Sequence, residues 1–383
     1  PQAADRPEVI AELAGRWLRE VPDDGLRTLV EVAATVRRFD QDLLAHMTGA
    51  PVSSGDFDRL TTLSFVRHGR GAWALHDLVR STILRELQWR SPDAFRTMRQ
   101  RALGHYARLS TLPGSESERA AALEEFFYLL GDSLIRAAFF DADDPSGVDL
   151  HVQPATPADL PALGAYMDAW RHDAARAAST DVELVDRQSR IHFHHVLPVE
   201  HNRREAELID ISSLLALGSG VVRMLKDPDG QIRGISVVIP VNAQTLGYLE
   251  SQAVTGPYFR SLSLRERAGY ATPPGRTRAW FLRLVDLRDP GDNAGRIAFQ
   301  RVLFPLMLRD GRILASTPLP FYQDLLHRFG LVEVEGATHF DYGPDNPSPT
   351  YILDLRGPRL AAYLAHLASG GDPGASALDS ALD

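Results

Sequence analysis

Apolar side chains recur at helical spacing through the first third of the chain. Four such stretches predict amphipathic helices: 7–18, 24–36, 42–47 and 56–63. Gly49 and Pro51 follow the third stretch, and both residue types commonly end helices. Two β-prone runs then surround the turn at 68–71, which contains two glycines, so the segment 64–75 is expected to form a β-hairpin.

Helices followed by a hairpin predict a winged helix at the start of the chain. Further helical stretches follow the hairpin: 76–89, 91–109 and 118–140. A Pro/Gly/Ser break at 111–117 separates the last two, and the polar segment 141–146 is expected to be a domain boundary. We therefore predict a winged-helix domain at 1–110 and a helical linker at 111–147.

From residue 148 onward the pattern alternates between strands and helices. The strands are expected at 148–153, 221–225, 232–241, 246–252, 278–287, 313–316, 331–334 and 351–355. The helices are expected at 157–170, 296–308 and 320–329. The polar, histidine-rich segment 171–215 has no clear pattern. We predict an α+β domain at 148–368 and a disordered tail at 369–383, where small polar residues dominate.

Composition excludes several kinds of chemistry. The chain of 383 residues has no cysteine, so thiol nucleophiles, disulfides and thiolate-bound zinc are ruled out. Its net charge of −9 disfavours binding to a phosphate backbone. No apolar run approaches the length of a membrane span, and the charged start does not resemble a signal peptide. We expect a cytoplasmic protein that binds no membrane, and the charge disfavours nucleic-acid binding unless a basic face is segregated.

The first domain resembles the winged-helix part of STAND-type signalling ATPases. The run Leu75-His76-Asp77-Leu78-Val79-Arg80 is similar to the M-H-D-L-V-R run that closes that domain in the family. The resemblance implies that His76 senses the nucleotide's phosphates in an intact protein. Lys226 is the only lysine, so no phosphate-binding loop of the GxxxxGK[ST] type exists here. The nucleotide-binding domain is therefore expected as a missing N-terminal partner, and the start at Pro1 is taken as that of a fragment.

The second domain resembles the GNAT fold of acyl-CoA-dependent N-acyltransferases over residues 149–356. Three stretches carry the resemblance: Gln153–Leu160, Asp229–Ile235 and His327–Leu331. The resemblance implies a central mixed, mostly antiparallel sheet. It also implies acetyl-CoA or another acyl-CoA as cofactor, a small acyl or amine ligand as partner, and no metal.

In the GNAT family, backbone N–H groups at a helix N-terminus hold the cofactor's pyrophosphate. The corresponding loop is 288–295, where the expected cofactor-binding residues are Arg288, Gly291, Asn293, Ala294, Gly295 and Arg296. Asp289 and Asp292 lie in the same loop and would repel a polyphosphate. Alternatively, Asp292 or Asn293 simply caps the helix.

Acyl transfer in this family commonly uses a tyrosine as general acid. Leu326 occupies the expected position, and Tyr322 lies one helical turn earlier, where it is either the acid or part of a core-facing stripe. Asp286 and Glu250, both on predicted strands, are the candidate bases. Each is instead an ordinary buried carboxylate if an arginine such as Arg283 or Arg288 pairs with it.

The segment 192–201 gathers four histidines and a glutamate: His192, His194, His195, Glu200 and His201. Alternation places His192 and His194 on one strand face, so a two-histidine metal site is conceivable. A solvated or substrate-facing segment is the favoured interpretation.

Three functions follow from these features. The first is a GNAT-like acyl-CoA-binding domain, an N-acyltransferase of degenerate site if active, attached to a STAND-type switch. The second is a catalytically inactive GNAT-fold sensor that regulates the ATPase. The third is a DNA-binding regulator, which the winged helix permits; however, its helix 56–63 carries a single cation, Arg59.

Overall fold

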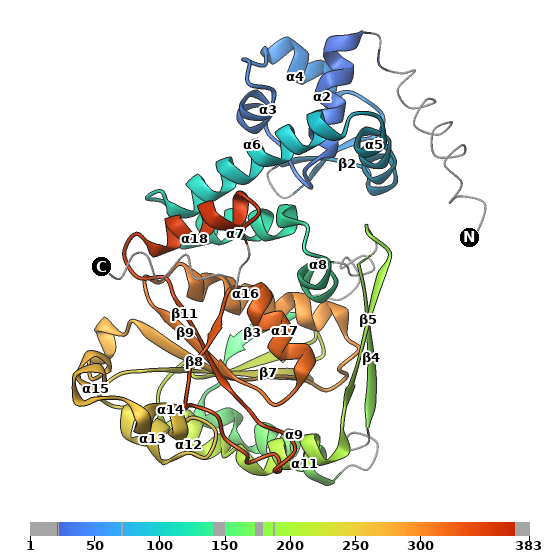
Figure 1. The fold of residues 1–383 in the computed structure, drawn as a ribbon. Helices are drawn as coiled ribbons and strands as arrows, with labels where there is room; N and C mark the ends of the chain where they lie inside the picture. Colours follow the sequence, from blue (N-terminus) through green and yellow to red (C-terminus); the bar gives the residue numbers. More distant parts are fainter. Residues whose placement is uncertain are drawn as a thin grey trace. The chain divides into compact units, whose positions relative to one another are not determined.

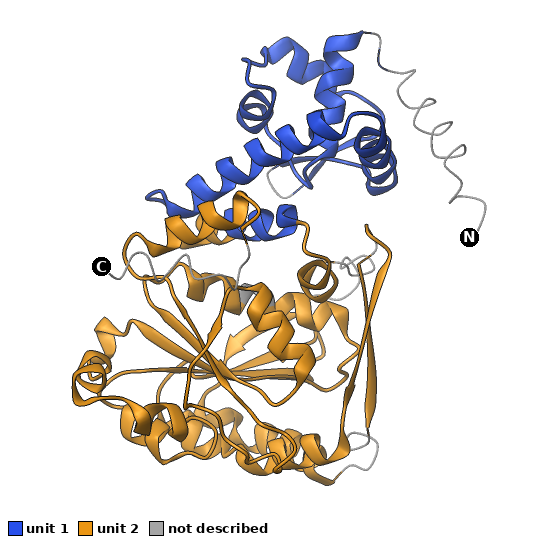
Figure 2. Ribbon diagram, in the orientation of Figure 1, with its two compact units in different colours: residues 1–114, 121–130 blue, residues 115–120, 131–383 orange. Residues whose placement is uncertain are grey.

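The computed structural model describes residues 21–371, apart from 22, 70–71, 141–149, 173–178 and 187 and the side chains of Gln300 and Arg301. The chain divides into two compact units, which are coloured in Figure 2. Unit 1 comprises residues 1–114 and 121–130, and unit 2 comprises residues 115–120 and 131–383. The predicted helix 7–18, the predicted boundary 141–146 and the tail from residue 372 lie outside the described residues.

Unit 1 is helical with one β-hairpin. Its elements are α2 (Asp24–Ala34), α3 (Gln41–Thr48), α4 (Ser54–Thr61), β1 (Val66–Gly69), β2 (Ala72–Leu75), α5 (Asp77–Arg90), α6 (Pro92–Thr111) and most of α7 (Glu116–Leu130). Asp23, Asp40 and Ser53 cap the first three of these helices through their side-chain oxygens. The predicted hairpin is confirmed, with Val66 opposite Leu75 in antiparallel register.

The single helix predicted at 118–140 is wrong, because two helices occupy this segment. Helix α7 ends at Leu130, and α8 (Ser133–Phe139) belongs to unit 2. Gly131 takes a left-handed φ of 71°, which a helix cannot continue through. The Asp132 side chain then accepts a hydrogen bond from the Ile135 N–H (2.9 Å) and starts the new helix.

Unit 2 is built on a seven-stranded mixed sheet with the strand order β10-β11-β9-β8-β7-β6-β3. The strands are β3 (His151–Pro154), β6 (Val222–Lys226), β7 (Ile232–Pro240), β8 (Ala279–Leu287), β9 (Arg312–Ser316), β10 (Val332–Glu333) and β11 (Thr350–Asp354). Neighbouring strands are antiparallel except β8 and β9, which are parallel. The unit is therefore an α+β arrangement with a mixed, mostly antiparallel sheet, as expected.

Helices cover both faces of this sheet (Figure 1). One face carries α16 (Asn293–Met307) and α17 (Pro320–Arg328). The other carries α9 (Leu160–His172), α11 (Val199–Leu208), α12 (Ile211–Ala216), α13 (Leu246–Ser251), α14 (Gly256–Ser261) and α15 (Leu264–Tyr270). Two short 3-10 helices, η2 (Pro157–Asp159) and η3 (Pro274–Arg276), precede α9 and β8 in the chain. Leu163, Tyr166, Ile235 and Phe281 are buried in the core beneath this second group. Helix α18 (Arg359–Ala368), which the pattern did not predict, follows the last strand.

The strand predicted at 246–252 is wrong, because α13 occupies this segment. Leu246 and Leu249, spaced as one helix face requires, are both buried in the core. Asn242 starts the turn that leads into the helix, since its side-chain oxygen accepts from the Gln244 N–H (2.9 Å). A short apolar run fits both the helical and the strand spacing, and here the packing of two leucines selects the helix.

A separate hairpin, β4 (Thr180–Asp186) and β5 (Ile191–Leu197), is formed by part of the segment for which the pattern gave no prediction. Arg136 of α8 anchors it through an ion pair with Asp186 (2.5 Å), and both side chains are buried. Because the Asp186 side chain is fully enclosed, this ion pair fixes the hairpin to α8.

Candidate functional site

Strand β8 extends well beyond the point where its pairing with β9 ends. The two strands pair from Ala279 with Arg312 to Leu282 with Ala315, and beyond this point β8 continues to Leu287 along β7. The β7–β8 register shifts so that Val237 faces Leu284 while Val238 faces Leu282, which leaves Arg283 as the extra residue of a β-bulge. The end of β9 and the bulge in β8 together leave the sheet open at this place.

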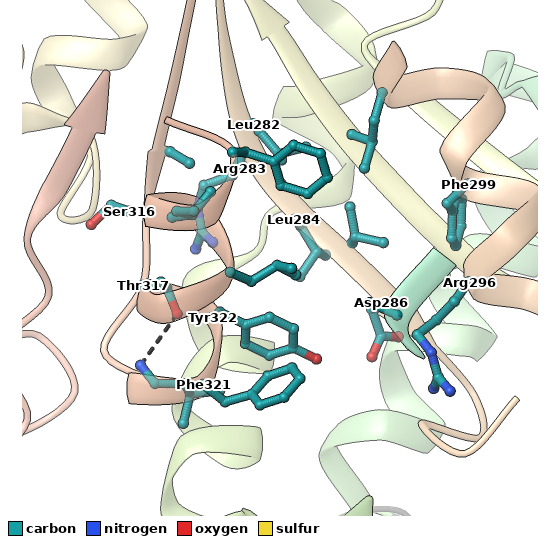
Figure 3. Close-up of a pocket in the computed structure, with 18 of the residues that line it drawn as sticks. Leu282, Arg283, Leu284, Asp286, Arg296, Phe299, Ser316, Thr317, Phe321 and Tyr322 are labelled. Carbon is teal, nitrogen blue, oxygen red and sulfur yellow. Dashed lines mark hydrogen bonds between the residues drawn. The ribbon is translucent and has the colours of Figure 1, made fainter. Parts of the chain in front are cut away.

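A cavity of about 300 Å³ lies at this opening (Figure 3). Most of its walls are apolar, formed by residues that include Leu282, Leu284, Phe299, Ala315, Phe321 and Leu325. A few polar side chains converge on it: Arg283, Glu205, Asp286, Arg296, Tyr322, Tyr342 and His195. Such a mainly apolar cavity with a few polar groups is typical of small-molecule sites.

Two of the predicted catalytic residues meet on one side of the cavity. Asp286 extends from β8 and Tyr322 from α17, and in Figure 3 the Tyr322 hydroxyl points toward the Asp286 carboxylate. The Asp286 carboxylate accepts a hydrogen bond from the Tyr166 hydroxyl (2.5 Å). Burial raises the pKa of Tyr322; nearby Arg296 opposes this shift and Asp286 adds to it. Tyr322 is therefore a neutral proton donor at pH 7, and its hydroxyl makes no hydrogen bond to the described residues.

His195 lies beside Tyr322. Its ring stacks on Phe321 with centroids 3.9 Å apart and meets the Tyr322 ring edge-on at 5.5 Å. Burial, with smaller contributions from Arg296 and His194, lowers the pKa of His195 to about 4. Both ring nitrogens are buried, and neither has a hydrogen-bond partner among the residues that the structure describes. Sequence analysis singled out His195 only as one member of a histidine cluster.

The rest of the histidine cluster is dispersed. β5 is a strand, as the alternation predicted, and His192 and His194 are both exposed on it. His192 contacts Glu183 across the hairpin (2.7 Å), while His201 stacks on Tyr342 at 5.1 Å. Within the described ranges, no three or more side chains of histidine or acidic residues are grouped so that they can hold a metal ion. This placement favours the substrate-facing interpretation for His195 alone.

Arg283 occupies the other side of the cavity and pairs with Glu205 of α11, not with Asp286. The side chains of Arg283 and Glu205 are only 7% and 6% exposed. Arg283 Nη1 donates to Glu205 Oε1, and the Tyr342 hydroxyl donates to Glu205 Oε2. Burial alone would lower the pKa of Arg283, but Glu205 raises it above its ordinary value, so the guanidinium stays charged. In the sequence Arg283 is a cation between Leu282 and Leu284, a signal that does not identify its partners Glu205 and Tyr342.

The predicted cofactor loop satisfies its amides with its own carboxylates. The Gly291 N–H donates to Asp289 Oδ1 and the Gly295 N–H to Asp292 Oδ1, each at 2.9 Å. Asp292 is the N-cap of α16, which begins at Asn293 and not at residue 296. The alternative prediction, that Asp292 caps the helix, is therefore confirmed. Asp292 also pairs with Arg233 (3.5 Å).

The other predicted cofactor residues lie close to the same loop. Arg296 donates to the Pro290 carbonyl and to Asn293 Oδ1, and it lines the cavity. Its Nε is buried with no partner among the described residues. Arg288 is exposed, with its guanidinium 5.8 Å from the centre of the Tyr166 ring, and Ala294 is half-buried in the first turn of α16. Only Arg296 of this set reaches into the cavity.

Two predicted residues lie elsewhere. Glu250 is on α13, where it pairs with Arg267 (2.8 Å), and it does not line the cavity that holds Asp286 and Tyr322. His76 is exposed in unit 1 at the start of α5, and its backbone N–H donates to the Phe65 carbonyl (2.8 Å).

No helix within the described residues is both long and apolar enough to cross a membrane. No protein-family model, curated protein or solved structure matches this chain significantly.

Proposed function

We propose that unit 2 is a GNAT-like binding domain that holds a small acyl compound in the cavity between β8 and β9 and acts as a sensor. The observation that carries this proposal is the cavity itself, which combines apolar walls with buried polar groups that have no hydrogen-bond partner among the residues that the structure describes. Buried polar groups ordinarily find hydrogen bonds within the protein. Groups left without them at a cavity wall are suited to contact a ligand.

The sheet topology supports the GNAT-like assignment. An antiparallel run β3-β6-β7-β8 is followed by a parallel β8-β9 pair, connected through the long helix α16. Beyond Leu282 the strand β8 continues without β9, which ends at Ser316, and residues of both strands line the cavity. A splayed strand beside the acyl-carrying group is what the resemblance to acyl-CoA-dependent transferases implies.

The loop at 288–295 favours sensing over CoA-dependent transfer. A pyrophosphate would need the backbone N–H groups that now donate to Asp289 and Asp292. It would also approach two carboxylates of the same sign, and like charges at close range repel strongly when water is partly excluded. Binding of an acyl compound without the nucleotide part of coenzyme A avoids both costs.

Acyl-CoA-dependent N-acyl transfer is the second candidate, and the group formed by Asp286, Tyr322 and His195 favours it. In such a reaction the amine nitrogen attacks the thioester carbonyl carbon, the C–N bond forms and the C–S bond breaks. A base such as Asp286 or neutral His195 takes the amine proton, and Tyr322 gives its proton to the leaving thiolate. Burial keeps the Tyr322 hydroxyl protonated, so it holds the proton that the thiolate needs, although its raised pKa makes it a weaker acid.

A thermal-shift titration of the full chain tests both candidates, with octanamide, acetyl-CoA and free CoA as probes. A ligand at about 100 times its Kd adds about 2.7 kcal/mol to stability, which moves a transition by a few degrees. The sensor predicts a shift with octanamide and none with CoA. An Ala315→Phe substitution fills the cavity at a buried wall position and should abolish the shift. Release of free thiol from acetyl-CoA with an amine acceptor, lost in Tyr322→Phe, would instead support transfer.

For unit 1 we propose the winged-helix part of a STAND-type switch. Helices α2, α3 and α4, the β1–β2 hairpin and then α5 follow one another in the expected order. The exposed His76 ring is accessible to the phosphates of a nucleotide held by a partner domain. Arg59, the cation on α4, already pairs with Asp56 (3.4 Å) and with Asp23, which disfavours DNA reading. A gel shift with duplex DNA at low salt tests the DNA-binding alternative, and no retardation is expected.

A further inference from the structure

Arg283 carries a buried donor that nothing in the described structure satisfies. Its side chain is 7% exposed, and Nη2 has no hydrogen-bond partner among the described residues. The side chain projects among the cavity-lining groups in Figure 3, with Leu284 and Tyr322 between it and Asp286. Burying an N–H without a hydrogen-bond partner is unfavourable, so the fold retains this group against a penalty.

The charge of Arg283 is nevertheless already neutralised. Glu205 Oε1 accepts from Nη1, and the other oxygen of Glu205 accepts from the Tyr342 hydroxyl. Both carboxylate oxygens are therefore occupied, and the Arg283–Glu205 pair has no net charge. Arg283 Nη2 can therefore still donate hydrogen bonds at this side of the cavity, although the positive charge of the guanidinium is already balanced by Glu205.

We infer that Arg283 Nη2 recognises the carbonyl oxygen of a neutral acyl compound, an amide, ester or thioester, whose apolar chain lies along the cavity wall. This inference rests on the proposed binding function and names its ligand class. The wall beside Arg283 includes Leu282, Leu284 and Ala315, which offer apolar contact to such a chain. The cavity of about 300 Å³ is at the small end of ligand sites, which suits a short or medium chain.

A free carboxylate is the poorer ligand for this position. It would bring an uncompensated negative charge next to the neutral Arg283–Glu205 pair in an apolar cavity, where isolated charges are costly. A neutral carbonyl accepts the same hydrogen bond without that cost. A primary amine offers no acceptor to Nη2 when protonated, and its positive charge would face the guanidinium.

The experiment uses the full chain and three probes of equal chain length: octanamide, octanoate and octylamine. Binding is measured by calorimetry, and the amide is labelled with ¹³C at its carbonyl for NMR. Octanamide should bind about tenfold or more tightly than either charged probe. Its carbonyl resonance should move downfield on binding, since the oxygen accepts a hydrogen bond from a guanidinium.

Arg283→Lys keeps the positive charge beside Glu205 but shortens the donor. It should weaken octanamide binding roughly 10- to 100-fold, the range expected for a hydrogen bond to a charged group, and should reverse the carbonyl shift. The matched control is Arg265→Lys on α15, an exposed arginine outside the cavity, which should change neither quantity. If Arg283→Lys does not fold, the probe preference and the carbonyl shift in the wild-type chain still decide the question.

Two failures are distinguishable. Binding of all three probes with similar affinity and an unshifted carbonyl resonance would overturn the role of Arg283 while leaving the binding function in place. Absence of binding by every probe would overturn the proposed function and this inference together.

Discussion

Two regions of unit 2 contain polar groups in positions where a ligand is expected. In one region the protein itself satisfies their hydrogen bonds, and in the other it does not. In the loop at 288–295, the N–H groups of Gly291 and Gly295 donate to aspartates of the loop itself. In the cavity, Arg283 Nη2, Arg296 Nε and both nitrogens of His195 are buried without partners among the described residues. A satisfied loop gains nothing from an anion, whereas an unsatisfied cavity wall gains hydrogen bonds from a ligand. The difference favours the cavity over the loop as the place of the binding site that we propose.

The largest expected effect concerns the ion pair at the cavity wall. Glu205→Ala leaves Arg283 charged and buried and removes the acceptor of the Tyr342 hydroxyl. We expect the free energy of unfolding to fall by roughly 3–5 kcal/mol, as when one member of a buried pair is removed. Denaturant titration measures it. Glu207→Ala on the same helix breaks an exposed pair with Arg204 and should cost less than about 1 kcal/mol. Equal losses of unfolding free energy in the two variants would contradict the claim that burial makes the Arg283–Glu205 pair important for stability.

The next effect is a pH dependence that originates at His195. Its pKa is lowered from 6.5 to about 4 in the folded chain, so between these values the unfolded chain binds a proton that the folded chain does not. Titration of His195 therefore leaves the free energy of unfolding at its full value above pH 6.5 and lowers it as pH falls toward 4. The loss amounts to at most about 3 kcal/mol.

The test compares the free energy of unfolding at pH 7 and pH 5 in wild type and His195→Gln. The variant should lose less stability on acidification than wild type does. His192→Gln, at an exposed position on the same strand, should keep the wild-type dependence. A wild-type slope in His195→Gln would show that other groups cause the acid sensitivity.

A third comparison separates two tyrosines near Asp286. Tyr166→Phe removes a hydroxyl that donates to the Asp286 carboxylate at 2.5 Å and should cost roughly 1.5–3 kcal/mol, as for hydrogen bonds to charged groups. Tyr322→Phe removes a hydroxyl with no partner among the described residues, so stability should change by less than about 0.5 kcal/mol. Thermal unfolding of both variants decides it. A large loss in Tyr322→Phe would mean that its hydroxyl is already bonded in the free protein.

Much of the fold was predictable because local patterns and packing agree. Turn residues and apolar runs fit only β-structure in the hairpins at 64–75 and 221–241 and in the strand at 278–287. The segment 246–252 was misjudged because its seven residues fit both the helical and the strand spacing of apolar residues. Only the burial of Leu246 and Leu249 on one face shows that it is a helix. The break at Gly131 was missed because a glycine within a helical pattern is tolerated unless the next residue caps a new helix.

The site was predictable only in part. Asp286, Tyr322 and Arg296 were found because the resemblance located the strand and the two helices that carry them. Glu250 was selected on the wrong secondary structure. Glu205 and Tyr342 were invisible, since their importance lies in a contact between residues 137 positions apart. Long-range pairing of buried polar groups has no local signature, so no pattern in the sequence could reveal the Arg283 side of the cavity.

The smallest expected effect tests the loop directly. The double substitution Asp289→Ala and Asp292→Ser removes two negative charges and frees the Gly291 N–H, while serine at position 292 keeps a good N-cap for α16. If the aspartates are what exclude a pyrophosphate, CoA affinity should rise about tenfold, equivalent to about 1.4 kcal/mol, with little change in octanamide affinity. Calorimetry at two salt concentrations measures both ligands, because a gain from phosphate contacts must weaken as salt is added. Tight CoA binding by the wild-type chain would reverse the comparison and make the loop, not the cavity wall, the main determinant of ligand choice.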